Sequence, residues 1–272
     1  MHAASESASA PAGDDNATTA TATDPRAVAY VLRIADSALI HGQRLAQWCG
    51  HAPVLEEDIA LTNIALDHIG QARLLLTLAG QMEGRGRDED AQAFQRIEPE
   101  FRNVTMLELP RGDFANTMLR SFLWSAFMAV LWPALATSSH RQLAAIAAKS
   151  LKECRYHQQH TADWVVRLGD GTSESHRRMQ QALDDLWPYA AEWFEADEID
   201  RHAQTAQLGP AWNGLHVPWL AAVETVLREA GLTPPAKTPF LSTGKQGRHS
   251  EHMGYLLAEM QSVARAFPGA VW

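Results

Sequence analysis

Apolar residues recur at three- and four-residue steps along nearly the whole chain, and this period constrains the fold more than any other feature. Such steps place side chains on one face of an α-helix, whereas a half-buried strand requires alternation, which no segment shows. The pattern predicts helices over about 24–49, 55–83, 88–97, 113 to beyond 132, 140–168, 172–196, 218–230 and 248–266. Pro133 and Pro188 are expected to kink or divide two of them. Long helices with short connections predict an all-α helical bundle.

Composition indicates a globular protein and excludes several classes of partner. Hydrophobic residues make up 46% of the 272 residues and charged residues 20%. The net charge of −9 argues against nucleic acid, which would require a basic face. The most apolar stretch, 121–136, is shorter than the roughly 20 residues of a membrane span, so we expect a buried helix and no membrane. Two cysteines, Cys49 and Cys154, form no disulfide framework, which favours a cytoplasmic protein.

The N-terminal end differs in composition from the rest of the chain. Residues 1–23 are rich in Ala, Ser and Thr and lack the basic and apolar regions of a signal peptide. We expect a disordered tail there and one helical domain over residues 24–272.

Polar residues interrupt the apolar stripes of three predicted helices, where a buried carboxylate requires a partner. The interruptions are Asp36 and His41 in the first helix, Asp67, His68 and Gln71 in the second, and Glu153, Tyr156 and His157 in helix 140–168. They predict a carboxylate–histidine cluster between these helices, which is either a metal centre or a hydrogen-bonded network in the core.

The spacing of these residues departs from that of a di-iron bundle. Such a site takes one Glu from each of two helices and Glu-x-x-His from each of the other two. Arg120 is the only charged residue between 114 and 139, and if Glu153 opens a motif, Tyr156 occupies the histidine position. The helix 55–83 offers only His68-x-x-Gln71 or Asp67-x-x-Gly70. The sequence therefore predicts a degenerate di-iron site with no catalytic or metal-binding residue assigned. Glu153 and His157 are expected to contact each other, Tyr156, or residues such as Asp67 and Gln71.

Long segments of the chain resemble a known family. They begin "ADSALIHGQRLAQWCGH" at residue 35, "LKECRYHQQHTADWVVRLGDGT" at residue 151 and "GKQGRHSEHMGYLLAEM" at residue 244, and the similarity covers about residues 26–272. The chain is similar to the C subunits of bacterial phenylacetyl-CoA epoxidases, also called ring 1,2-epoxidases.

This resemblance implies a ferritin-like bundle with extra helices at the C-terminus and a role in phenylacetate degradation. It implies a non-catalytic subunit that docks with and supports a related A subunit, which carries the di-iron centre and binds the CoA thioester. A reductase subunit that supplies electrons from NADPH and the small subunits would be indirect partners. This chain would hold no cofactor, and self-association as a homodimer is a further expectation.

Alternative interpretations of the residues stay open at this point. One is a stand-alone metal-dependent oxidase with a divergent site that uses Asp36, His41, Asp67, Glu153 and His157. Another is a helical protein that binds a CoA thioester without chemistry. Residues 244–252 precede a predicted helix and carry basic side chains, so they form either an anion contact or a simple loop. The Pro- and Gly-bearing segment 200–246 is a candidate interface.

Overall fold

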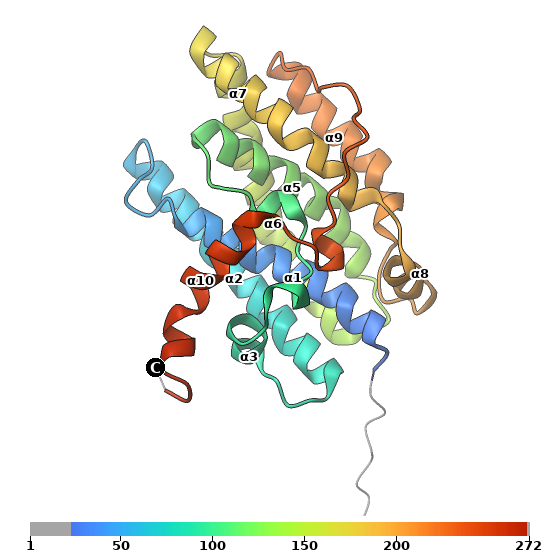
Figure 1. Ribbon diagram of the computed structural model, residues 1–272. Coiled ribbons are helices and arrows are strands. Elements are labelled where there is room, and N and C mark those ends of the chain that lie inside the picture. Colours follow the sequence, from blue (N-terminus) through green and yellow to red (C-terminus); the bar gives the residue numbers. More distant parts are fainter. Residues whose placement is uncertain (1–22, 271–272) are drawn as a thin grey trace, which may run out of the picture.

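The computed structural model describes residues 23–270, and four long helices form its centre (Figure 1). Helix α1 (Pro25–Ala46) packs along α2 (Leu55–Glu83), and α5 (Phe114–Leu135) packs along α6 (Arg141–Gly169). Contacts between α2 and α6 join the two pairs into a ferritin-like bundle. Within residues 23–270 there is no strand, only an isolated bridge between Thr243 and Arg248. The predicted all-α fold is confirmed, while the predicted tail lies outside the described residues apart from Thr23.

Shorter helices surround this bundle. They are α3 (Glu89–Phe94), α4 (Thr105–Glu108), α7 (Ser173–Leu186), α8 (Glu198–Thr205), α9 (His216–Glu229), α10 (Glu251–Ala266) and the 3₁₀ helices η1 (Glu98–Glu100), η2 (Trp187–Phe194), η3 (Trp212–Leu215) and η4 (Gly244–Gln246). α7 and α9 cover α5, α8 packs on α1, and α10 contacts α3, α4 and η1. The sequence did not predict α4 or α8, which are too short to show a helical period.

The ends of the long helices follow local signals that the sequence carries. The Asp24 carboxylate accepts a hydrogen bond from the Arg26 backbone N–H at 2.8 Å and caps α1, in which proline is the first residue. Asp113 caps α5 in the same way, by accepting from the Asn116 backbone N–H at 2.9 Å. At the end of α2, Gly84 has a φ of 69°, a left-handed conformation that favours glycine. These caps explain why the predicted boundaries of the long helices lie close to the observed ones.

The two prolines have different effects: the predicted helix is divided at Pro188, as expected, whereas α5 is not divided at Pro133. Pro133 lies in the last turn of α5, so the helix ends two residues later at Leu135 and is not divided. Pro188 lies in the first turn of η2, and the predicted helix 172–196 becomes an α-helix up to Leu186 followed by a 3₁₀ helix. The proline removes a backbone donor at that point, which ends the α-helical hydrogen-bond ladder.

Helix α5 is the central helix of the molecule. It is long and apolar enough to cross a membrane, but 78% of its most apolar window is buried inside the protein. Its Trp124 and Phe127 pack against Trp193 of η2, with ring centroids 5.6 and 5.4 Å apart. The prediction of a buried core helix over this stretch is therefore confirmed.

Helix α9 is attached to α5 through Trp219. The indole Nε1–H donates to the Leu123 carbonyl at 3.1 Å, and the ring packs on Trp193 and Phe194. Buried indoles with such contacts belong to the core. The structure therefore places Trp219 in the core.

We expect Trp219→Ala to lower the free energy of unfolding by about 3–5 kcal/mol, because it leaves a large cavity and removes the hydrogen bond from the indole to α5. Val217→Ala is the matched control on the same helix, since Val217 is 76% exposed, and should change the free energy by less than about 0.5 kcal/mol. Urea unfolding followed by circular dichroism measures both variants. Equal losses would contradict this account of how α9 is attached.

Candidate functional site

Two hydrogen-bonded pairs connect α2 and α6 at the predicted polar cluster. The Gln71 Nε2 donates to the Glu153 Oε2 at 2.9 Å, and the His157 Nε2 donates to the Asp67 Oδ2 at 2.9 Å. Each helix contributes residues four apart, which places the two pairs one turn from each other. The expected contacts of Glu153 and His157 with Gln71 and Asp67 are confirmed, so both candidate ligands already bind neighbours within the chain.

Three histidine rings lie side by side at this cluster. His41 of α1 lies 4.9 Å from His68 of α2, and His68 lies 5.0 Å from His157 of α6, between ring centroids. Neither ring nitrogen of His41 has a hydrogen-bond partner among the described residues, nor does the Nδ1 of His68. Burial lowers the pKa of all three, and for His157 the hydrogen bond to Asp67 offsets part of the effect. The histidines are therefore neutral at pH 7.

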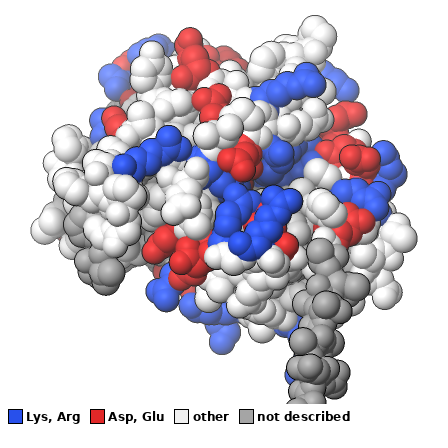
Figure 2. Space-filling model, turned by 60° about the horizontal axis from the view of Figure 1, so that its bottom comes forward, with Lys and Arg blue, Asp and Glu red and all other residues white. Residues whose placement is uncertain are grey.

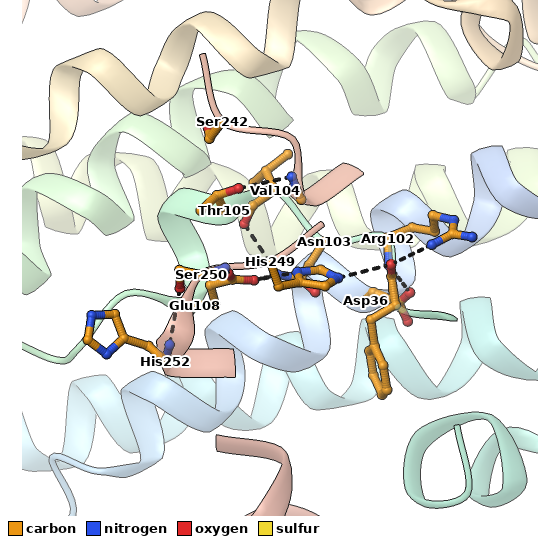
Figure 3. Close-up of polar contacts among 12 residues, drawn as sticks. Asp36, Arg102, Asn103, Val104, Thr105, Glu108, Ser242, His249, Ser250 and His252 are labelled. Carbon is orange, nitrogen blue, oxygen red and sulfur yellow. Dashed lines mark hydrogen bonds and ion pairs between the residues drawn. The ribbon is translucent and has the colours of Figure 1, made fainter. Parts of the chain in front are cut away.

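Asp36 does not join this cluster, contrary to the prediction. Its carboxylate binds the Arg96 guanidinium and accepts from the Arg102 backbone N–H at 2.8 Å (Figure 3). Asp36 and His41 are five residues apart on α1, which turns their side chains about 140° away from each other. The two residues consequently face different parts of the core.

Tyr156 is also outside the buried cluster. Its side chain is 53% exposed and stacks on His160, with ring centroids 5.8 Å apart. The buried residues on this part of α6 are Cys154, His157 and Thr161. The sequence had predicted Glu153 and Tyr156 on the buried side of the helix, so the observed buried side differs from the predicted one by about one residue. Glu153 consequently lies at the half-buried edge of the helix interface.

The donor set at this position does not fit a di-iron centre. Across residues 23–270, no group of three or more His, Cys, Asp or Glu side chains is arranged to hold a metal ion. Helix α5 presents hydroxyl groups on this side: the Ser125 Oγ lies 3.4 Å from the Thr161 Oγ1 of α6. Bridging two irons requires carboxylates from facing helices, and α5 supplies none.

A second polar network, which the sequence did not predict, joins α4 to the C-terminal segment (Figure 3). The Glu108 carboxylate lies 2.7 Å from the His249 Nδ1 and accepts from the Asn103 Nδ2 at 2.8 Å and the Ser250 backbone N–H at 2.5 Å. The other ring nitrogen of His249 lies 3.1 Å from the Phe101 carbonyl oxygen. Since both nitrogens face acceptors, the ring is an imidazolium. Burial lowers the pKa of His249, but Glu108 outweighs this effect and raises it overall.

Lys245 is part of the same internal attachment. It is 1% exposed, and its Nζ binds the Glu195 carbonyl oxygen and lies 3.5 Å from the Asp200 Oδ2. Its backbone N–H donates to the Glu192 Oε1 at 2.7 Å. Two basic residues of the segment 244–252, Lys245 and His249, thus bind partners inside the protein. The alternative interpretation, in which they contact an external anion, is wrong for these two residues. No period links these residues to partners 45 to 141 positions away, so sequence patterns could not reveal the pairing.

Comparison with known proteins agrees with this architecture. A family model described as "Phenylacetic acid catabolic protein" matches residues 6–272. The chain belongs to this family. A curated relative of this chain is the C subunit of the 1,2-phenylacetyl-CoA epoxidase of Escherichia coli (strain K12). The two are 45% identical over 244 residues, which cover 90% of this chain and 98% of the relative. The resemblance stated from the sequence is confirmed.

We expect Asp36→Ala to destabilise the protein by about 3–5 kcal/mol, because it leaves the buried Arg96 guanidinium unpaired. The control is Glu174→Ala, which removes an exposed pair with Arg177 and Arg178 and should cause no comparable loss. Urea unfolding at pH 7 measures both. A loss below about 1 kcal/mol for Asp36→Ala would contradict a buried ion pair here.

The histidine cluster should make the protein less stable in acid. The unfolded chain binds protons as the pH falls below about 6.5, whereas the native histidines, with lowered pKa values, stay neutral. Stability is therefore fully present above that pH and is lost as the pH falls. Between pH 6 and 5, the His41→Leu variant should therefore lose about 1.4 kcal/mol less unfolding free energy per pH unit than the wild type.

The measurement is urea unfolding from pH 5 to 7.5, with Val217→Ala as control, which should keep the wild-type slope because its side chain is exposed and carries no titratable group. His249 contributes a slope of opposite sign, since its pKa is raised, but it is present in every variant and cancels in the difference. An unchanged slope for His41→Leu would contradict a neutral His41.

Proposed function

We propose that this phenylacetic acid catabolic protein is the non-catalytic structural subunit of a cytoplasmic phenylacetyl-CoA 1,2-epoxidase, and that it docks with and supports the di-iron A subunit. The observation that carries the proposal is the 45% identity to an epoxidase C subunit across 98% of that relative's length. Such similarity over whole chains supports the proposal that this chain occupies the position of the C subunit in an epoxidase complex. The substrate reaction then takes place in the partner, with electrons from the reductase.

The chemistry of the polar cluster supports a non-catalytic role. Glu153 is hydrogen-bonded to the Gln71 amide and His157 to the Asp67 carboxylate. Each side chain therefore already has a partner at an atom that a metal ion would need as a ligand. The Cys154 thiol is buried, and burial raises its pKa to about 12, so it is a poor nucleophile. On this proposal the chain itself holds no cofactor.

The charge distribution supports a protein partner over nucleic acid. On the face in Figure 2, Lys and Arg side chains are interspersed with Asp and Glu and with uncharged areas. A nucleic-acid interface would instead gather positive charge over a continuous surface. The mixed charge on this face therefore argues against nucleic acid as the partner.

The test is co-expression of this chain with the A subunit of its epoxidase, followed by measurement of mass and iron. We expect the two subunits to purify as one complex, with the iron accounted for by the A subunit. The isolated chain, loaded with iron anaerobically and desalted, should hold far less than one iron per molecule. The A subunit prepared alone is the control for iron content.

Two outcomes would overturn the proposal. Iron near two per chain, with oxidation by this chain alone and metal loss in a folded Glu153→Ala variant, would indicate a stand-alone oxidase. Calorimetric binding of CoA thioesters to the isolated chain, without any complex with the A subunit, would instead indicate an acyl-CoA-binding protein.

A further inference from the structure

Helix α2 carries a second apolar line on the side that faces away from the bundle. Leu55, Ile59 and Leu66 are 72%, 55% and 60% exposed. With the half-buried Thr62 they recur at steps of four, three and four residues, the heptad spacing of a helix–helix seam. At about 100° per residue, the three exposed side chains fall within an arc of roughly 40°. We call these four residues the outer stripe.

The outer stripe lies opposite the side of α2 that packs in the core. Buried residues of α2, among them Leu61, His68 and Leu75, lie roughly 120–160° around the helix from Leu55. A helix at the surface of a bundle normally has one apolar side and one polar side. On the outer side of α2, Leu55, Ile59 and Leu66 are instead apolar and more than half exposed in the described part of the chain.

Gly70, beside the outer stripe, is an independent sign that something approaches this side. It lies in the interior of α2, where glycine weakens a helix relative to alanine. A Cβ at Gly70 would meet nothing within 4 Å, whereas at Gly42 it would meet the Ile69 Cγ1 at 3.1 Å and at Gly80 the Arg87 carbonyl oxygen at 2.0 Å. Contacts within the chain explain the absence of a side chain at Gly42 and Gly80 but not at Gly70. Close approach of another backbone would explain it.

The charges on α2 favour a partner other than a second copy. Carboxylates of Glu56 and Asp58 lie on either side of Leu55 in the first turn of the helix, and the only cation of α2, Arg73, already contacts Glu89 at 3.4 Å. Pairing two copies of α2 would bring both sets of carboxylates to one seam, which is unfavourable. A different helix, with Lys or Arg beside an apolar seam, complements this side.

We propose that the outer stripe and Gly70 bind one helix of the A subunit, which presents an apolar heptad seam flanked by basic residues. This inference rests on the proposed function and adds the surface that carries it. The partner helix approaches most closely at Gly70, and Ile59 and Leu66 pack between its side chains.

The test measures binding of the full chain to purified A subunit, alongside thermal melting of the chain alone. Leu66→Asp should weaken binding about tenfold or more while leaving the melting temperature nearly unchanged, since this side chain is exposed. Gly70→Ala should raise the melting temperature by about 2–4 °C but weaken binding about tenfold. Opposite effects on stability and binding distinguish a contact from a folding defect. Val217→Asp, at an exposed apolar residue of α9, is the control and should bind as the wild type does.

The outcomes separate this inference from the proposed function. If wild-type chain fails to bind the A subunit, the proposed function fails and this inference with it. If wild type binds and both variants bind equally well, the proposed function stands and this inference is overturned. If sedimentation shows a wild-type dimer that Leu66→Asp dissociates, a second copy occupies the stripe, and the assignment to the A subunit is wrong.

Discussion

The burial of charge in the interior is the constraint on which the rest of the structure depends. Asp36 and Glu108 have no exposed surface, and each is balanced by a cation from elsewhere in the chain, Arg96 and His249. An uncompensated charge at such a position costs several kcal/mol, which is a large part of a domain's net stability. The C-terminal segment must therefore return to α4 for the bundle to be stable. The extra helices at the C-terminus are consequently part of the core and not an appendage.

The interface between α2 and α6 shows how a ferritin-like bundle can keep polar residues without using them as ligands. Carboxylate, amide and imidazole groups remain on the facing helices, but each binds its neighbour across the seam. Pairing removes the cost of burying them. His41 and His68 are different, because three of their four ring nitrogens have no partner among residues 23–270. Because burial lowers the pKa of both histidines, they make the folded protein sensitive to acid.

Helix α2 contributes residues both to the interior and to the surface of the protein. Its inner side supplies Asp67, His68 and Gln71 to the polar cluster, and its outer side carries the exposed apolar stripe. A helix that is apolar on two opposite sides is stable in a monomer only because its inner contacts are extensive.

The sequence by itself determined the helices and part of the site. The three- and four-residue period identified α2 and α6, and proline and capping residues identified the ends of the long helices. The polar residues that interrupt the apolar stripes included Asp67 and Gln71 among the expected partners of Glu153 and His157. Only the tertiary structure decided that Asp36 turns to Arg96, that Tyr156 is exposed, and that Lys245 and His249 are buried. Periodicity defines the sides of a helix to within about one residue, or 100°, which is too coarse to separate an edge position from a core position. Partners more than a hundred residues apart, such as Glu108 and His249, are chosen by how irregular segments pack, and such segments carry no period from which the pairing could be inferred.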